Sequence, residues 1–181
     1  MGALSTIRNI YYRGSLEYCN YTCSYCPFGR KSASADTDGD REALHRFISR
    51  IGQWKHGALR ILIIPYGEAM IHRYYREGII RLAAMPHVAG VSCQTNLSFS
   101  VSRFLDEVEE ARADVTKIKF WASYHPEMAD VTEFASKIEK LHAAGIEVCA
   151  GVVGDRSATE LIRRLRLLLD PSVYLFVNAM Q

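Results

Sequence analysis

Three of the five cysteines in this chain of 181 residues lie close together, in the run Cys19-Asn-Tyr-Thr-Cys23-Ser-Tyr-Cys26. Cys23 and Cys26 are near enough in sequence for one turn to direct both sulfurs at one centre, which Cys19 approaches from the other side. The run is one cysteine short of the four thiolates that complete a structural zinc site or a self-contained iron–sulfur cluster. Three thiolates on a four-iron cluster would leave one iron with an open coordination position, and an open position allows chemistry.

Zinc and a disulfide are the alternative uses of these cysteines. Zinc ribbons also contain C-x2-C, but they carry a second pair, and no later C-x2-C or H-x3-H partner follows in this sequence. A disulfide is disfavoured because the cysteine count is odd and the sequence shows no export signal. Free thiols without an export signal favour the reducing cytoplasm as the location of the protein.

The elements that must position the cysteines follow a strand–helix rhythm. Apolar runs rich in β-branched residues alternate with amphipathic stretches, which predicts a parallel sheet with right-handed crossovers. A complete eight-fold barrel needs about 250 residues, so six strands in this length indicate a partial, open barrel. We expect strands at Ile10–Leu16, Leu59–Pro65, Val88–Gln94, Val115–Ser123, Ile146–Val153 and Val173–Asn178. We expect helices at Arg41–Gln53, His72–Met85, Val101–Arg112, Asp130–Ala144 and Ser157–Leu169, and a loop at Lys31–Asp40.

Two of these helices have clear start signals. Asp130-x-x-Glu133 and Ser157-x-x-Glu160 are capping-box patterns, which satisfy free amide donors at a helix N-terminus. The helix that begins at Asp130 should end at Gly145. Its buried stripe should consist of Val131, Phe134, Ile138 and Leu141.

The cysteine run resembles the CxxxCxΦC signature of the radical S-adenosylmethionine (SAM) superfamily, with Tyr25 as the aromatic Φ. Further stretches are similar to one subfamily with a CNYxCxYCPF cluster loop, whose members are longer and have no settled substrate. These stretches are Tyr12-Arg-Gly-Ser-Leu, Pro65-Tyr-Gly-Glu-Ala, Gln94-Thr-Asn-Leu-Ser, Ser123-Tyr-His-Pro-Glu and Gly151-Val-Val-Gly. The resemblance implies an α/β fold, a partial (β/α)6 TIM-like barrel of parallel strands, as one radical SAM core domain over residues 1–181. Because the sequence stops directly after the sixth strand, we expect it to be truncated there and to lack a C-terminal extension.

The resemblance also implies the cofactors and their ligands. Cys19, Cys23 and Cys26 would hold a 4Fe–4S cluster whose open iron binds the amino and carboxylate groups of SAM. Gly67 and Glu68 resemble the GGEP motif that holds the SAM ammonium, although Tyr66 replaces its first Gly and Ala69 its Pro. The other expected SAM contacts are Tyr25 and Val153 at the adenine, and Asn96 and Ser123 at the ribose or carboxylate. Each of these residues also has an ordinary structural alternative. Ser and Asn side chains at strand ends, for example, form hydrogen bonds to the backbone of the following loop.

His125 is the candidate catalytic residue, because a histidine titrates near neutral pH and suits proton transfer. The alternative is a structural role, in which the imidazole of a loop histidine forms hydrogen bonds with nearby backbone groups. His125 follows a predicted strand, as the cysteine run, Gly67 and Asn96 do, and ligands of parallel α/β folds bind at this edge. Asn178 lies at the end of the last strand, without an assigned role.

The function implied by the resemblance is that of a radical SAM enzyme. An electron from a low-potential donor such as flavodoxin or ferredoxin would cleave SAM to methionine and a 5′-deoxyadenosyl radical, which abstracts hydrogen from an unknown substrate. The alternatives are an activase or peptide-modifying maturase that acts on a protein partner, and a non-catalytic iron–sulfur or SAM-binding protein. A net charge of +2 does not favour nucleic-acid binding. No apolar run reaches the roughly eighteen residues of a membrane span.

Overall fold

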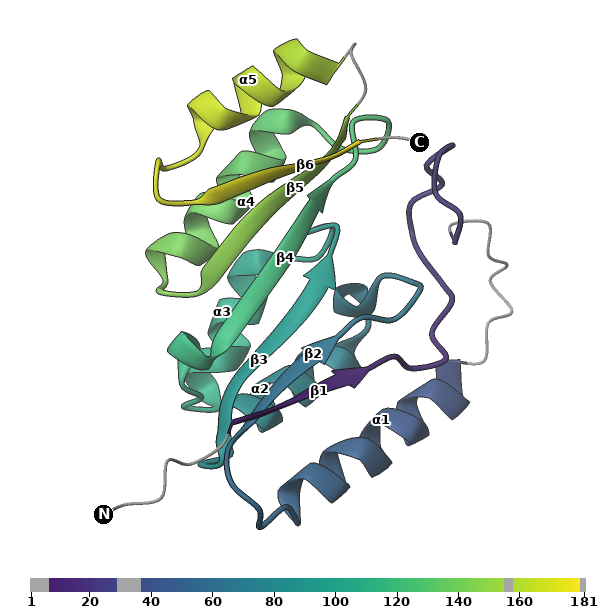
Figure 1. Cartoon of the computed structure of the whole chain (residues 1–181), viewed down its shortest axis with the longest axis vertical. Coiled ribbons are helices and arrows are strands. Elements are labelled where there is room, and N and C mark those ends of the chain that lie inside the picture. Colours follow the sequence, from purple (N-terminus) through teal and green to yellow (C-terminus); the bar gives the residue numbers. More distant parts are fainter. Residues whose placement is uncertain (1–6, 29–36, 155–157, 180–181) are drawn as a thin grey trace.

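Six parallel strands form one sheet, in the order β1-β2-β3-β4-β5-β6, in the computed structural model, which describes residues 7–28, 37–154 and 158–179. Each strand therefore pairs with the next one along the chain (Figure 1). This topology confirms the predicted α/β class and the partial barrel of six parallel strands. The strands are β1 (Arg8–Tyr12), β2 (Leu59–Ile63), β3 (Val88–Thr95), β4 (Ile118–Tyr124), β5 (Glu147–Gly154) and β6 (Tyr174–Ala179).

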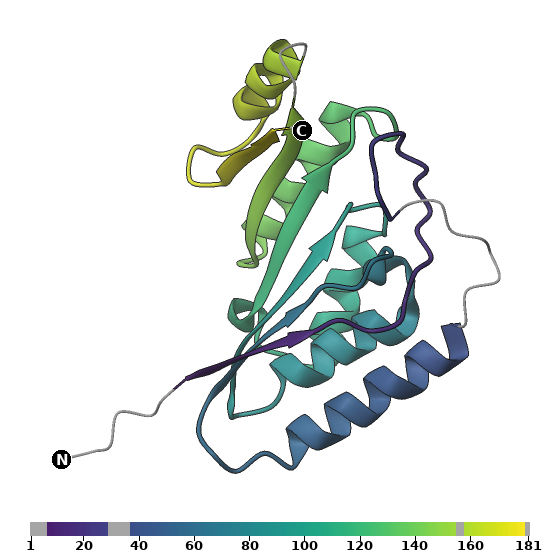
Figure 2. The ribbon, with the colours of Figure 1, turned by 45° about the vertical axis from the view of Figure 1, so that its right-hand side comes forward.

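Helices connect the strands and pack on one face of the sheet, as the turned view in Figure 2 shows. Their amphipathic stripes supply the apolar side chains that the core needs from this layer. None of the described helices is both long and apolar enough to span a membrane. The helices are α1 (Thr37–Gly52), α2 (Arg73–Ala83), α3 (Val101–Glu110), α4 (Val131–Ala143) and α5 (Thr159–Leu168), with short 3-10 helices η1 (Ala69–Ile71) and η2 (Val115–Lys117).

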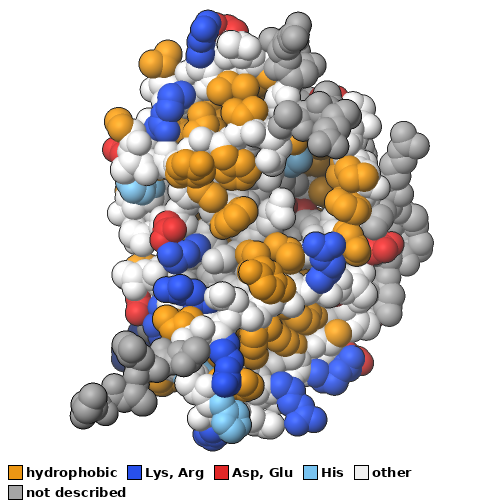
Figure 3. All heavy atoms as spheres, viewed as in Figure 1, with side chains coloured by type: hydrophobic (Ala, Val, Ile, Leu, Met, Phe, Trp, Pro, Cys, Tyr) orange, Lys and Arg blue, Asp and Glu red, His pale blue; other side chains and the backbone are white. Residues whose placement is uncertain are grey.

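The hydrophobic core lies between the sheet and the helices. Along β4, the buried Phe120 and Ala122 alternate with Trp121, which is 49% exposed. Such alternation is typical of a strand with only one covered face. Figure 3 shows hydrophobic side chains gathered on the other face, which the helices leave open, and Tyr11 and Tyr174 are each 69% exposed.

Helix α4 has the start, stripe and end that its sequence predicts. The Asp130 carboxylate accepts hydrogen bonds from the amides of Thr132 and Glu133. The predicted stripe is buried, and Gly145 follows the helix with a positive φ of 84°. The second predicted capping box begins at Ser157, which lies outside the described residues.

Three predicted boundaries are wrong by three or four residues, whereas the other boundaries of the described elements lie within two residues of the prediction. Helix α1 begins at Thr37, inside the predicted loop, and the remainder of that loop to residue 36 lies outside the described residues. Strand β1 ends at Tyr12 rather than Leu16, because the Leu16 carbonyl accepts from the Gly67 amide beyond the end of β2. The predicted fourth strand begins with the 3-10 turn η2, whose free amide is capped by the Asp114 carboxylate.

Candidate functional site

The loop that carries the three cysteines, residues 16–28, follows β1 and passes the carboxyl ends of the neighbouring strands. Figure 1 shows it as the dark purple segment beside the ends of β2 to β5. We call it the cysteine loop. The turns that follow β2, β3 and β4 all contact it. The topology therefore brings the predicted cluster loop and three of the predicted strand-end motifs to one edge of the sheet.

The first half of the cysteine loop is held by the turn after β2. The Gly67 amide donates to the Leu16 carbonyl (3.0 Å), and the Glu68 amide donates to the Tyr18 carbonyl (2.9 Å). A Cβ atom at Gly67 would lie 2.0 Å from the Tyr18 carbonyl oxygen. Only glycine allows this close backbone approach. Gly67 thus has a structural reason to be glycine, whatever the turn binds.

Glu68 is buried, and its carboxylate is occupied by donors of its own chain. One oxygen accepts from the Thr95 hydroxyl (2.7 Å) and the Met70 amide (3.0 Å), and the other accepts from the Asn96 amide (2.6 Å). Burial raises the pKa of Glu68 to about 7, although these three hydrogen bonds oppose the rise. The carboxylate joins the turn after β2 to the end of β3.

Asn96 extends this connection to the first cysteine. Its side-chain nitrogen donates to Asn20 Oδ1 (3.2 Å) and lies 3.9 Å from the Cys19 sulfur. Its side-chain oxygen accepts from the Ser98 amide (2.9 Å). The buried Asn96 side chain is therefore fixed from both sides. It links Glu68 to the start of the predicted cluster motif.

The second half of the cysteine loop is held by the turn after β4, residues 125–128. His125 Nδ1 lies 2.9 Å from the Tyr25 hydroxyl and 3.4 Å from the Cys23 sulfur. The His125 ring stacks on the Tyr25 ring and meets the Tyr21 ring edge-on. Burial lowers the pKa of His125, which keeps the imidazole neutral at neutral pH. The predicted catalytic histidine thus contacts the motif itself.

Glu127 makes the second contact in this region, and its partner was not foreseen from the sequence. Its carboxylate accepts from the Ser24 amide (2.7 Å) and the Ser24 hydroxyl (2.5 Å). These two bonds lower the pKa of the exposed Glu127 carboxyl. The pair of contacts, His125 with Tyr25 and Glu127 with Ser24, is called the clasp below. Its members are about a hundred residues apart in sequence, so no local pattern reveals it.

The three thiols share one loop but do not form a preassembled metal site. Burial raises the pKa values of Cys19 and Cys23, and the charges of neighbouring cysteines raise them further. Within the described ranges, no three His, Cys, Asp or Glu side chains are arranged to hold a metal ion. The donor set itself fits an iron–sulfur cluster, because thiolates are the ligands that such clusters use. Ligation by Cys19, Cys23 and Cys26 stays a prediction.

Two predicted SAM contacts lie apart from the loop. Ser123 pairs with Gly151, and Val153 pairs with Asn178, at positions on the open face of the sheet. Neither Ser123 nor Val153 makes a hydrogen bond to the cysteine loop in the part of the chain that the structure describes. Their roles, like those of Tyr25 and Asn96, stay predictions.

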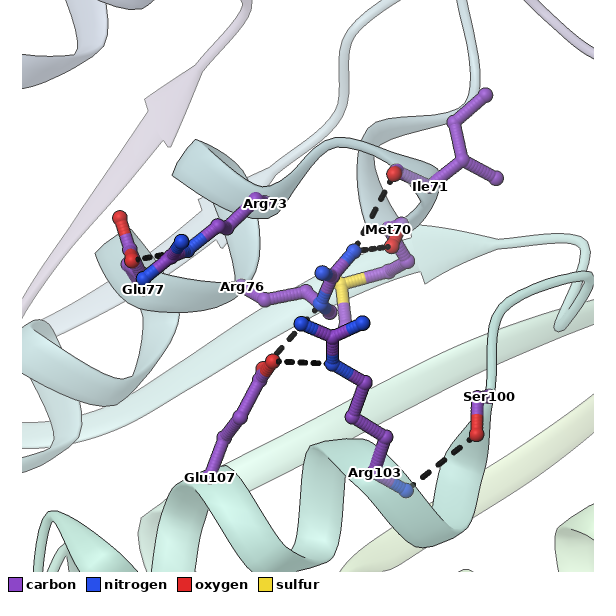
Figure 4. Close-up of polar contacts among 8 residues, drawn as sticks. All are labelled: Met70, Ile71, Arg73, Arg76, Glu77, Ser100, Arg103 and Glu107. Atoms are coloured by element: carbon purple, nitrogen blue, oxygen red, sulfur yellow. Dashed lines mark hydrogen bonds and ion pairs between the residues drawn. The ribbon is translucent and has the colours of Figure 1, made fainter.

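The turn after β2 is also supported from the helical side. Arg76 of α2 is buried and donates to the carbonyls of Met70 (2.9 Å) and Ile71 (3.2 Å), which directly follow Glu68 and Ala69. Its guanidinium also pairs with Glu107 of α3 (3.2 Å), which Arg103 contacts as well, as Figure 4 shows. A cleft of about 700 Å³ lies here between α2 and α3. No predicted site residue lines this cleft.

Comparison with solved structures shows the fold and leaves the family open. The sequence matches no family model and no curated protein. Two structures of anSMEcpe with bound AdoMet, one with a hexahistidine tag and one native, have TM-scores of 0.66 and 0.65 at 13% and 14% identity, over 96% and 97% of this chain. BtrN in complex with AdoMet and 2-DOIA has a TM-score of 0.51 at 20% identity, over 99% of this chain and 72% of its own. The chain spans about half the length of the anSMEcpe chains, 50% and 52%. This likeness confirms the predicted fold, a partial barrel of six parallel strands.

Proposed function

We propose that this chain is the core of a radical SAM enzyme, in which Cys19, Cys23 and Cys26 hold a 4Fe–4S cluster and SAM binds beside it. The observation that carries the proposal is the cysteine loop, which bears three thiols and is tied at both halves to the carboxyl edge of a parallel sheet. Reactive groups of such sheets gather at this edge. The similar folds of two proteins solved with AdoMet add support.

The residues of the chain would position the cofactors rather than react themselves. When bound, the cluster and SAM would supply reductive cleavage to a 5′-deoxyadenosyl radical, with an electron from a flavodoxin- or ferredoxin-type donor and an unknown hydrogen-donating substrate. A carboxylate accepts about four hydrogen bonds, and Glu68 already accepts three, which hold the Gly67 turn and Asn96 in place. The remaining acceptor position of Glu68, next to Gly67, would bind the SAM ammonium.

The remaining predicted residues complete this proposal. His125 keeps a neutral imidazole next to Cys23, where a hydrogen bond to a ligating sulfur would tune the cluster potential. Tyr25 and Asn96 would contact SAM from the loop side. Ser123 and Val153 would contact it from the open face of the sheet.

Anaerobic reconstitution with iron and sulfide tests the proposal. Wild-type protein should turn brown and, with dithionite and SAM, release 5′-deoxyadenosine that mass spectrometry detects. Cys23→Ala should lose both properties. Cys149→Ala removes a half-buried thiol from β5, outside the loop, and should keep both. Wild-type protein that binds only zinc would refute the proposal. Protein that binds iron and SAM without cleavage would be a non-catalytic binding protein instead.

A further inference from the structure

The clasp fixes the part of the cysteine loop that lies between two predicted functional residues. Ser24 stands between Cys23, a predicted ligand, and Tyr25, a predicted SAM contact. Glu127 accepts from both hydrogen-bond donors of Ser24, the amide and the hydroxyl. The orientation of this residue therefore depends on a carboxylate 103 positions away. In an ordinary exposed loop, an amide such as that of Ser24 would hydrogen-bond to water.

The turn that presents Glu127 is itself held on several sides. The His125 carbonyl accepts from the amides of Met128 and Ala129, which closes the turn. The Ala129 carbonyl accepts from the Tyr124 hydroxyl (3.0 Å), and Tyr124 is a buried residue of β4. Pro126 fixes its own φ and restricts the backbone of His125 before it. Glu127 is thus presented by a turn that is built onto the sheet.

We propose that Glu127 is a positioning residue for the cluster motif: through Ser24 it holds Cys23 and Tyr25 in the orientation that cluster binding needs. This inference rests on the proposed function for the cluster, whereas the clasp consists of contacts between side chains and backbone of the chain itself. A bond from a carboxylate to a backbone amide is stronger than one between neutral groups, and here one carboxylate makes two bonds to the same residue. His125 supplies the second point of attachment.

The test uses three variants and one matched control. Glu127→Ala removes both hydrogen bonds. Glu127→Gln can keep both, because its amide oxygen accepts from the Ser24 amide and its nitrogen donates to the Ser24 hydroxyl. Ser24→Ala removes only the hydroxyl bond. Glu109→Ala, on the solvent-exposed side of α3, removes a glutamate with no hydrogen bond from its side chain to another described residue.

Hydrogen exchange of the metal-free protein and iron retention of the reconstituted protein are both measured. In Glu127→Ala, the peptide that spans residues 19–26 should exchange about tenfold faster, with other peptides unchanged, because two net-favourable bonds are lost. The same variant should lose iron to a chelator faster than wild type. Glu127→Gln should restore both properties toward wild type, Ser24→Ala should be intermediate, and Glu109→Ala should match wild type.

The results separate this inference from the proposed function. If Glu127→Ala exchanges as slowly as wild type in the loop peptide, or exchanges faster yet retains iron equally well, the positioning role of Glu127 is overturned. If exchange rises in all peptides together, Glu127 supports the whole fold and the inference is also overturned. Wild-type protein that retains no iron would overturn the proposed function, and the exchange data would then confine Glu127 to holding the loop.

Discussion

Substituting Glu68 with glutamine tests the physical account of the buried turn. The Glu68 side chain is enclosed by protein, and its ionised form has lost its water. This loss raises its pKa from the ordinary value of 4.5 to about 7. Glutamine has almost the same shape and does not titrate. The substitution therefore removes one specific contribution to the pH dependence of stability.

The sign and size of this contribution follow from the pKa shift. Between pH 4.5 and about 7, the folded chain keeps a proton on Glu68 that the unfolded chain has released. The resulting stabilisation is complete below pH 4.5 and is lost as the pH rises through about 7. One pKa unit corresponds to about 1.4 kcal/mol, so wild type loses about 3 kcal/mol of unfolding free energy over this range.

Glutamine has a cost of its own, but that cost does not depend on pH. Its nitrogen cannot accept a hydrogen bond, so one of the three donors to Glu68 is left unpaired. An unpaired buried donor costs about 1–3 kcal/mol. Glu68→Gln should therefore be less stable than wild type at pH 5. By pH 8 wild type has lost about 3 kcal/mol of unfolding free energy, so Glu68→Gln should be as stable as wild type there or more stable.

Urea unfolding followed by circular dichroism between pH 5 and 8 measures this difference. Relative to wild type, the unfolding free energy of Glu68→Gln should rise by about 2–3 kcal/mol between pH 5 and pH 8. Glu109→Gln, an exposed change on α3, should follow the wild-type curve at every pH. Parallel curves for wild type and Glu68→Gln would show that the carboxyl group is not desolvated, and the reasoning would fail.

Three further substitutions test the scaffold around the site. Gly67→Ala places a Cβ atom 2.0 Å from the Tyr18 carbonyl oxygen, so we expect a loss of about 1–3 kcal/mol in urea unfolding; an unchanged midpoint would contradict the close approach. Arg76→Met leaves two carbonyls without their donor and Glu107 with Arg103 as its remaining partner, and should cost about 2–4 kcal/mol by the same measurement; a loss below about 0.5 kcal/mol would mean that the network is not needed. Phe104→Ala empties a fully buried position and should cost about 3–5 kcal/mol, seen as a lower midpoint of thermal unfolding, whereas a loss below about 1 kcal/mol would contradict its place in the core.

Most strands could be predicted from the sequence, because a buried strand requires a run of apolar residues that is visible locally. The apolar runs that predicted β3 and β5 match the observed strands to within about one residue at each end, since inward-facing positions of a covered sheet must be apolar. The start of α1 has no such pattern. Asp40 in its first turn is fully buried, because Ser15 and Tyr74 donate to its carboxylate from 25 and 34 residues away. Contacts of this kind cannot be read from neighbouring residues.

The same distinction holds at the candidate site. The cysteine loop, Gly67 and Asn96 each follow a predicted strand. Because parallel strands end at the same edge of a sheet, this spacing was sufficient to predict that they lie at one edge. The internal partners of Glu68 were not predictable, because its sequence context resembles a cation-binding motif while its carboxylate accepts bonds from its own chain. Glu127 belongs to one of the stretches that resemble the radical SAM subfamily, but the sequence of that stretch does not predict Ser24 as its partner.

The two halves of the cysteine loop are fastened to two different strands. Cys19 is tied through Asn96 to the end of β3, whereas Cys23 is tied through His125 to the end of β4. The separation of these sulfurs therefore depends on the twist between β3 and β4. Beneath the sheet, the rings of Phe104 in α3 and Phe120 in β4 meet edge to face and hold β4 against the helical layer. We therefore expect repacking of these two rings to shift the end of β4, and with it the position of Cys23 relative to Cys19.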